Sequence, residues 1–253
     1  MIIASWNVNS VRARLPLLLK WLSEAQPDVL LLQELKCMDE DFPRLEVESM
    51  GYKTAVWGQK SYNGVAILSR YPLQEVHRGL PEDENGQARY LEALIQGVRV
   101  ASVYAPNGNP VGTEKYEYKI DWMSKLKRYI KTLLVSEMPF IMGGDFNVIP
   151  EERDVFDPKG WEKDALFLPQ TRAAWREILH LGVRDAFRAL HPEETAFSFW
   201  AYQNGAWQRD EGLRIDHFLL SPEIADRLEK CYFDRTPRGW DKPSDHTPVV
   251  MEI

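Results

Sequence analysis

Cysteine and long apolar runs are both scarce in this sequence. Only Cys37 and Cys231 occur in 253 residues, far apart and in no spacing that a metal site uses. This scarcity argues against a disulfide framework and a cysteine-based zinc site, and it favours a reducing compartment. No apolar run approaches the roughly 20 residues of a membrane-spanning helix, and the first residues show no secretory signal pattern. We therefore expect a cytoplasmic protein with no membrane partner.

The chain also lacks several common catalytic motifs. It contains no GxxxxGK[ST] phosphate loop, no HExxH zinc motif, no GxSxG nucleophile turn and no CxxC pair. If the protein is an enzyme, these absences favour a hydrolase that uses carboxylates and a divalent metal.

Basic residues are outnumbered by acidic ones, 31 to 38, which gives a net charge of −7. An acidic balance is unusual for a nucleic-acid-binding protein, but binding depends on where the charges lie. Basic residues gather near Arg12, in Lys115–Lys131, and between Arg235 and Lys242. Because the group at 115–131 has helical spacing, we expect it to form a solvent-exposed helix face. Charge neither requires nor excludes a polyanionic partner.

Short apolar runs alternate with helical patterns along the chain. The expected strands are 2–6, 29–32, 64–68, 91–95, 98–104, 139–142, 196–201, 215–220 and 247–253, and the expected helices are 11–24, 114–135 and 171–181. No linker or repeat divides the sequence, so we expect one α/β domain over residues 1–253. The pattern favours two packed sheets with helices outside, and a single doubly wound sheet is the alternative.

Polar residues recur where these apolar runs begin or end. The set comprises Asn7, Glu34, Tyr104, Asn107, Asp145, Asn147, Asp216, Asp245 and His246. Taken singly, such residues are usually turn or cap residues. Glu34 and Asp216 are harder to explain in this way, because a carboxylate beside buried apolar residues is costly unless it is paired or bound to a metal.

Taken together, these residue types suit phosphodiester hydrolysis. A hard cation needs oxygen ligands such as Glu34 and a nearby aspartate. Neutral amides hold phosphoryl oxygens without adding negative charge, a role that suits Asn7, Asn107 and Asn147. An imidazole can stabilise the charge of the transition state, while a further group handles the proton of the attacking water.

Eight segments resemble the exonuclease III family of abasic-site endonucleases, within the endonuclease/exonuclease/phosphatase superfamily. In chain order they are SWNVN (5–9), LQELKC (32–37), YNGVAILS (62–69), VYAPN (103–107), GGDFNV (143–148), FSFW (197–200), GLRIDH (212–217) and SDH (244–246). The strings Gly-Asp-x-Asn and Ser-Asp-His are shared by the broad superfamily. The strings at 32–37 and 214–220 are narrower and point to its DNA-repair branch.

This resemblance implies a DNase I-like fold, a four-layered α/β sandwich of two mixed β-sheets packed face to face with helices outside. It also implies a monomeric base-excision-repair nuclease that uses Mg²⁺ or Mn²⁺. The implied reactions on double-stranded DNA are cleavage 5′ to abasic sites, 3′→5′ exodeoxyribonuclease action and trimming of 3′ ends.

The resemblance also assigns roles to the polar set. Glu34 would be the principal metal ligand, with Asn7 and Asp245 close to the metal. The catalytic residues would be Tyr104, Asp145, Asn147, Asp216 and His246. Asp145 would handle the proton of the attacking water or of the leaving oxygen, and Asp216 would orient His246 against a phosphate oxygen.

Substrate contacts follow from the same comparison. Asn107 would lie beside Tyr104, while Phe199, Trp200 and Leu213 would line a pocket for an abasic sugar flipped out of the helix. Two positions depart from the pattern or vary within it: Asn9 stands where some members have an aspartate, and Asp164 lies in a variable segment near the site.

Two other functions share parts of this sequence pattern. A phosphoesterase for small molecules or lipids would need a similar set of catalytic residues, but the residues at 199, 200 and 213 and the lack of an apolar membrane-facing segment argue against it. A non-catalytic nucleic-acid-binding protein should have lost at least one catalytic group, yet all of them are present.

Overall fold

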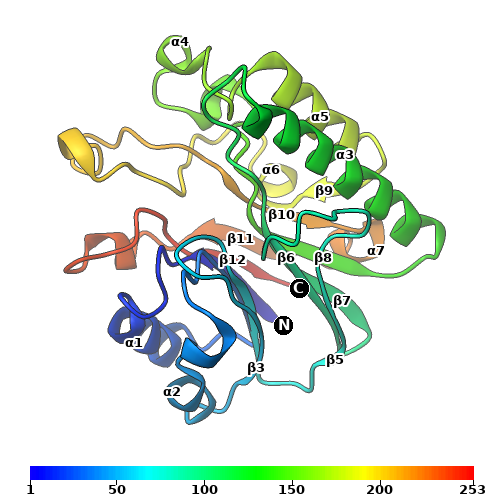
Figure 1. Cartoon of the computed structure of the whole chain (residues 1–253), viewed down its shortest axis with the longest axis vertical. Coiled ribbons are helices and arrows are strands. Elements are labelled where there is room, and N and C mark those ends of the chain that lie inside the picture. The colour runs from blue at the N-terminus through cyan, green and yellow to red at the C-terminus, as the bar shows by residue number, and fades with distance from the viewer.

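Two six-stranded sheets lie face to face and helices cover their outer surfaces in the computed structural model, which describes residues 1–253 (Figure 1). The strands are β1 (Ile2–Asn7), β2 (Val29–Gln33), β3 (Lys53–Trp57), β4 (Val65–Ser69), β5 (Gln74–Arg78), β6 (Tyr90–Ile95), β7 (Val98–Tyr104), β8 (Phe140–Asp145), β9 (Arg184–Asp185), β10 (Asp216–Leu220), β11 (Lys230–Phe233) and β12 (Val249–Glu252). The helices are α1 (Leu15–Ala25), α2 (Arg44–Glu48), α3 (Glu114–Val135), α4 (Pro158–Trp161), α5 (Pro169–Leu179), α6 (Ala186–Leu190) and α7 (Pro222–Ala225), with 3₁₀ turns at Asp39–Asp41, Glu152–Asp154, Gln203–Gly205 and Thr236–Gly239.

Both sheets are mixed. One has the strand order β11-β12-β1-β2-β4-β3 and the other β5-β6-β7-β8-β10-β9. In each sheet a single central pair is parallel, β1 with β2 and β7 with β8, and the remaining pairs are antiparallel. The predicted sandwich of two sheets is therefore confirmed, and the doubly wound single sheet is not.

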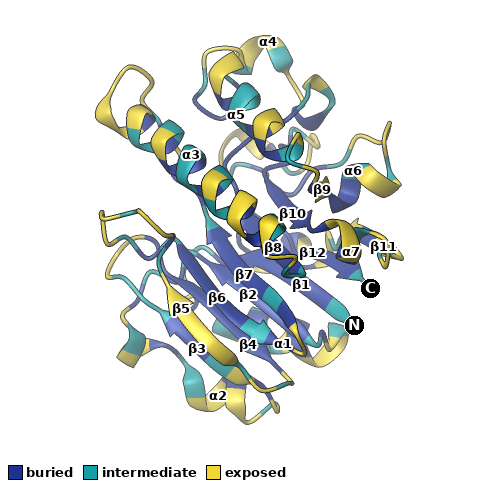
Figure 2. Ribbon diagram, turned by 90° about the vertical axis from the view of Figure 1, so that its right-hand side faces the viewer, coloured by how far each residue is buried: buried dark blue, intermediate teal, exposed yellow.

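Three apolar cores hold the four layers together. The central core lies between the sheets and includes Leu31, Ile67 and Phe218. A second core joins the first sheet to α1, where the rings of Trp6 and Trp21 meet edge to face with centroids 5.9 Å apart. A third lies under α3 and α5. Figure 2 shows buried strands between helices whose outer faces are exposed. No helix has the length and apolar character needed to cross a membrane.

The apolar runs predicted most elements, with differences that have local causes. The helix at 114–135 and the hairpin turn at Gln96-Gly97 form as expected, and both turn residues have the positive φ that a tight two-residue turn requires. Helix α5 begins at Pro169 rather than at 171, because the fixed φ of proline suits the first helical turn.

One predicted strand does not form, and four strands of the structure were not predicted. Residues 196–201 form no strand, since only isolated bridges join Phe199 to Leu213 and His246. Strands β3, β5, β9 and β11 were not predicted, and all four lie at sheet edges. In β5 all five residues are exposed, so no apolar run marks it.

The prediction of an exposed basic helix face at 115–131 is wrong for Lys119. Lys119 lies on the inner side of α3 and is completely buried, whereas Lys115 and Lys131 are exposed.

Candidate active site at one edge of the sheets

The strand order brings the polar strand-end residues to one edge of the sandwich. The parallel pairs β1–β2 and β7–β8 end at this edge, so Asn7, Glu34, Tyr104 and Asp145 arrive there together. Strand β10 runs antiparallel to β8 and begins here, with Asp216 paired to Asp145 in the register. Polar groups that are far apart in the sequence therefore meet at this edge because of the directions of their strands.

The backbone turns sharply directly after two of these strands. Glu34 follows β2 with φ of 54°, and Asn147 lies two residues beyond β8 with φ of 51°. Non-glycine residues rarely adopt this left-handed conformation, and it is found preferentially at functional sites. The turns keep both side chains over the sheet edge instead of letting them follow the chain into solvent.

Asn7 links two carboxylates that come from different sheets. Its Nδ2 donates to Glu34 Oε1 at 2.8 Å and to Asp145 Oδ2 at 3.0 Å. Its Oδ1 accepts the backbone N–H of Asn9 at 3.0 Å, which fixes the direction of the amide. In this arrangement Asn7 offers N–H groups to the carboxylates and no oxygen to a cation.

Glu34, Asp145 and His246 form a group whose potential ligand atoms lie within 4.8 Å of one another. Burial by itself would raise the pKa of Glu34, but the Lys36 ammonium 2.9 Å away and the Asn7 amide together lower it below its usual range. Two carboxylates facing one point are the oxygen donors that a hard divalent cation prefers.

Asp245 lies outside this group of three. Its Oδ1 accepts Asn9 Nδ2 at 3.0 Å, and Lys36 Nζ donates to Asn9 Oδ1 at 2.5 Å. Asp245 is thus connected to Glu34 through Asn9 and Lys36 rather than directly. An aspartate at position 9 would face both Asp245 and Lys36.

His246 and Asp216 form the predicted contact. The His246 Nδ1 lies 2.8 Å from Asp216 Oδ2, which also accepts Ser198 Oγ at 2.6 Å. Burial by itself would lower the pKa of His246, but the Asp216 carboxylate outweighs it and raises the value to about 10. His246 is therefore protonated at neutral pH, and its Nε2 lies 3.7 Å from Asp145 Oδ2.

Asp145 is buried among other charged groups. Burial raises the pKa of its carboxyl above the usual range, the charge of His246 opposes this rise, and Asp216 and Glu34 add to it. Its Oδ1 accepts the backbone N–H of Asn147 at 2.9 Å. A carboxylate held in this way can exchange a proton at a pH closer to neutral than an ordinary aspartate.

Amide and hydroxyl groups line the other side of the cluster. Asn107 Nδ2 donates to Asn147 Oδ1 at 3.1 Å, and Asn147 Nδ2 donates to the Ala105 carbonyl at 2.9 Å. Burial, followed by the charges of Glu34 and Asp145, raises the pKa of Tyr104 well above its usual value. Tyr104 is thus a neutral donor at neutral pH.

The three predicted sugar-pocket residues differ in exposure. Phe199 is partly exposed, and its ring centroid lies 5.0 Å from that of His246. Trp200 and Leu213 are fully buried. Trp200 donates its indole N–H to Asp210 at 2.9 Å and packs against Trp207. Only Phe199 presents a surface to the site here, and the substrate roles of all three stay predictions.

The variable-segment residue Asp164 is held by its neighbours. Its carboxylate accepts Asn109 Nδ2 at 3.1 and 3.2 Å and the Leu166 backbone N–H at 2.9 Å.

Three further residues at or behind the site were not singled out as site residues in the sequence analysis. Ser198 and Lys36 lie within the matched strings, and Lys119 was assigned to a solvated face.

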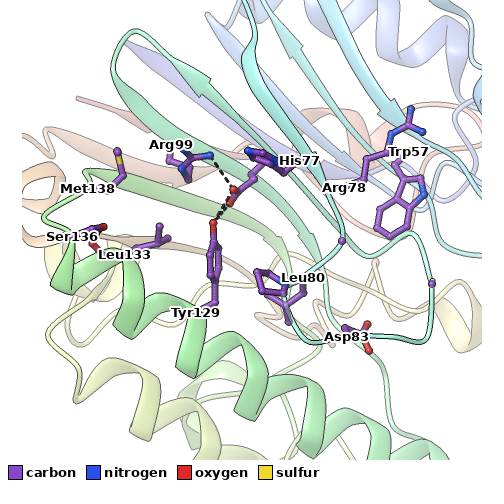
Figure 3. A pocket seen from close by; sticks show the side chains of 14 residues that line it. Trp57, His77, Arg78, Leu80, Asp83, Arg99, Tyr129, Leu133, Ser136 and Met138 are labelled. Carbon is purple, nitrogen blue, oxygen red and sulfur yellow. Dashed lines mark hydrogen bonds and ion pairs between the residues drawn. The ribbon is translucent and has the colours of Figure 1, made fainter.

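Two polar clefts of about 430 Å³ each flank the cluster. One includes Arg12, Lys36 and Lys60, and the other includes Arg89 and Lys115 beside Tyr104 and Asn107. A larger cavity, about 700 Å³, lies elsewhere, between β5, β6 and α3 (Figure 3). Its buried Glu92 already accepts bonds from Tyr129 and Arg99, so it offers no comparable reactive cluster.

Comparisons with known proteins agree with this geometry. Residues 4–246 match the model of the endonuclease/exonuclease/phosphatase family. The chain is 33% identical to exodeoxyribonuclease III of Haemophilus influenzae, with 98% of each chain covered. It is similar to the structure of an AP endonuclease from Archaeoglobus fulgidus, with 37% identity, a TM-score of 0.97 and coverage of 100% and 99%.

A further solved relative is the 3′ phosphatase NExo from Neisseria, whose structure contains a product DNA hairpin. It is 38% identical to this chain, with a TM-score of 0.97 and coverage of 100% and 99%. The predicted family resemblance is thus confirmed. The chain belongs to the endonuclease/exonuclease/phosphatase family, as an enzyme of the exonuclease III and AP endonuclease type.

Proposed function

We propose that this enzyme cleaves duplex DNA on the 5′ side of abasic sites and also removes nucleotides and blocking groups from 3′ ends. The observation that carries this proposal is the single cluster that hydrogen bonds and one ion-pair contact form among Asn7, Glu34, Asp145, Asp216 and His246 at one sheet edge. The relatives described above support DNA as the substrate. Since one chain supplies the whole cluster, we further propose that it acts as a monomer.

We propose Mg²⁺ or Mn²⁺ as the cofactor. The donor set fits such an ion, because Glu34 and Asp145 bring carboxylate oxygens within 4.8 Å of each other. Glu34 would be the principal ligand, with Asn7 and Asp245 nearby. When bound, the ion would polarise the phosphoryl group and stabilise the negative charge that develops on it.

His246 would bind a non-bridging phosphate oxygen. Its Nδ1 is occupied by Asp216, so the proton on Nε2 faces the reacting group. Because its pKa is raised, His246 carries a positive charge at neutral pH. A fixed positive donor at this position stabilises the transition state more than it stabilises the ground state.

Asp145 would exchange the proton of the reaction. The Asn147 N–H and the Asn7 amide fix its two oxygens, so the carboxylate cannot rotate away from the cluster. Its raised pKa suits either removal of a proton from the attacking water or return of one to the leaving oxygen.

The basic side chains of the two flanking clefts would bind the DNA backbone. Arg12 and Lys60 line one of these clefts, and Arg89 and Lys115 line the other. Phosphate contacts of this kind position a duplex without reading its sequence. Local positive charge thus offers a DNA surface on a protein whose net charge is −7.

The direct test uses a duplex oligonucleotide with one central abasic site, and a matched duplex with a recessed 3′ end. We expect cleavage 5′ to the abasic site with Mg²⁺ and none after chelation, with activity restored when Mg²⁺ is added back. Absence of abasic cleavage with metal present, or equal cleavage with chelator, would contradict the proposal. The two rates under the same Mg²⁺ give the balance of activities.

A further inference from the structure

The buried ammonium of Lys119 is the most unusual charged group outside the catalytic cluster. Lys119 lies on α3, and its side chain has no exposed surface. Its Nζ donates to the carbonyl of Pro106 at 3.0 Å and to the carbonyl of Asn147 at 2.6 Å. No carboxylate lies within ion-pair distance, so two neutral carbonyls are its only hydrogen-bond partners.

These carbonyls belong to the two loops that carry the site amides. Pro106 directly precedes Asn107 in the loop after β7, and Asn147 lies in the loop after β8. On the site side, Asn107 Nδ2 donates to Asn147 Oδ1 at 3.1 Å. Lys119 joins the same two loops from the protein interior, so the amide pair is held from both sides.

The loop after β7 also packs directly on the Lys119 stem. Gly108 has φ of +90°, and a Cβ placed there would lie 2.6 Å from Lys119 Cδ. Because no side chain separates the loop from the lysine, the position of Asn107 depends closely on that of Lys119.

A buried lysine is a poor choice if only packing is required. Burial lowers the pKa of Lys119 to about 7, against the opposing effect of Asp145 and Asp164. A methionine or leucine fills a similar volume without this desolvation cost. The ammonium is therefore better explained by the carbonyls it holds.

We propose that Lys119 is a positioning residue that fixes the Asn107–Asn147 amide pair against the scissile phosphate by binding the backbone of both loops. This inference rests on the proposed function, because the amide pair acts only if the cluster binds a phosphodiester. Lys119 itself touches neither substrate nor metal.

The experiment compares Lys119→Met and Lys119→Arg with the wild type on the abasic duplex in Mg²⁺. Lys131→Met, on the exposed face of the same helix, is the matched control. We expect Lys119→Met to lower kcat by about 10- to 100-fold, since small misplacements of positioning groups have effects of this size. KM should change by less than about 3-fold, because the basic side chains that line the DNA-binding clefts are unchanged. Lys119→Arg should recover most of kcat, and Lys131→Met should match the wild type.

A second arm separates positioning from general damage. In an Asn107→Ala/Asn147→Ala background, Lys119→Met should lower single-turnover cleavage by less than about 3-fold, because both amides that it positions are already gone. If Lys119→Met does not fold, Lys119→Gln, which keeps two N–H donors on a shorter stem, is used in both arms and should lower kcat by at least about 5-fold.

The inference is overturned if a folded Lys119→Met keeps wild-type kcat, or if its loss is equally large in the Asn107→Ala/Asn147→Ala background. It is also overturned if the variant changes only the melting temperature. Failure of the proposed function looks different, since the wild type itself would then leave the abasic duplex uncut.

Discussion

The three aspartates of this site, Asp145, Asp216 and Asp245, have different surroundings although they lie close together. Asp145 is buried between His246 and two other carboxylates, and its pKa is raised. Asp216 accepts both His246 Nδ1 and Ser198 Oγ on one oxygen. Asp245 is only partly buried and bonds to Asn9. These differences in surroundings support the proposed roles of proton transfer for Asp145, orientation of an imidazole for Asp216 and support of the metal side for Asp245.

At this residue scale, Asp145→Asn should retain DNA binding but lose cleavage. The amide keeps the shape of the carboxylate but cannot exchange the proton, so we expect kcat to fall by about 10²- to 10⁴-fold. The Kd for uncut abasic duplex should change by less than about 3-fold. Gel-shift binding and single-turnover cleavage measure the two effects. Asp226→Asn, an exposed aspartate on the surface, is the control, and unchanged cleavage by Asp145→Asn would refute its role.

Glu34→Ala should change the metal response more than any other site substitution. If Glu34 is the principal ligand, the Mg²⁺ concentration for half-maximal cleavage should rise by at least about 10-fold. High Mg²⁺ should restore part of the activity. Titration of cleavage against Mg²⁺, together with calorimetric measurement of Mg²⁺ binding in the absence of DNA, tests this. A loss that no Mg²⁺ concentration recovers, with unaltered Mg²⁺ binding, would exclude the assigned role.

At the scale of elements, two glycines in β8 allow the close packing that positions the site residues. Gly143 packs against Phe218 and Leu31, where a Cβ would lie 2.3 and 2.8 Å from their side chains. Gly144 leaves no space beside β7, since a Cβ would lie 1.8 Å from the Val103 carbonyl oxygen. Close approach of strands and sheets at this point puts Asp145 beside Tyr104 and Asp216.

Gly144→Ala should therefore destabilise the sandwich by about 3 kcal/mol, because the obstructing atom is backbone and cannot move aside without breaking the ladder. Urea denaturation followed by circular dichroism gives this value. The matched control is Gly239→Ala, where a Cβ would meet nothing within 4 Å and φ is not positive. Equal stability of the two variants would show that the β7–β8 contact tolerates a side chain.

At the scale of the whole molecule, a buried polar cluster joins the second sheet to the loops behind the site. Arg214 is fully buried and binds Asp154 and Asp185 at 2.7 and 2.8 Å. His217 completes the cluster, with Nδ1 3.0 Å from Arg214 and Nε2 2.9 Å from the Val148 carbonyl. Burial, followed by the Arg214 charge, lowers the pKa of His217 to about 4.

This pKa predicts how stability depends on pH. Between about pH 4 and 6.5 the unfolded chain protonates this histidine while the folded chain does not, so its contribution to stability falls as the pH is lowered. From pH 7 to pH 5 the wild type should lose about 2 kcal/mol more than His217→Gln, which cannot titrate. Urea denaturation of both proteins at the two pH values tests this, and parallel losses would show that His217 is not held neutral.

The positions of strands and helices followed largely from apolar periodicity and turn residues. The continuous run at 29–32 became a strand buried on both faces, and the helix at 114–135 formed with the predicted bounds. The edge strand β5 escaped prediction because exposure on all sides removes the apolar signal. Residues 196–201 have strand-like composition, yet they form only bridges to Leu213 and His246.

The sequence alone determined which chemical groups this protein has: two carboxylates suited to a cation, amides for a phosphate, and an imidazole, each beside a strand end. Its short ordered strings were sufficient to recognise the family. Only the tertiary structure decided which groups meet. It joined Asn7 to both Glu34 and Asp145, and it buried Lys119 behind the amide loops. Such contacts join residues that are far apart in the chain, and they depend on strand direction and sheet packing. Local sequence patterns do not specify which distant residues will meet.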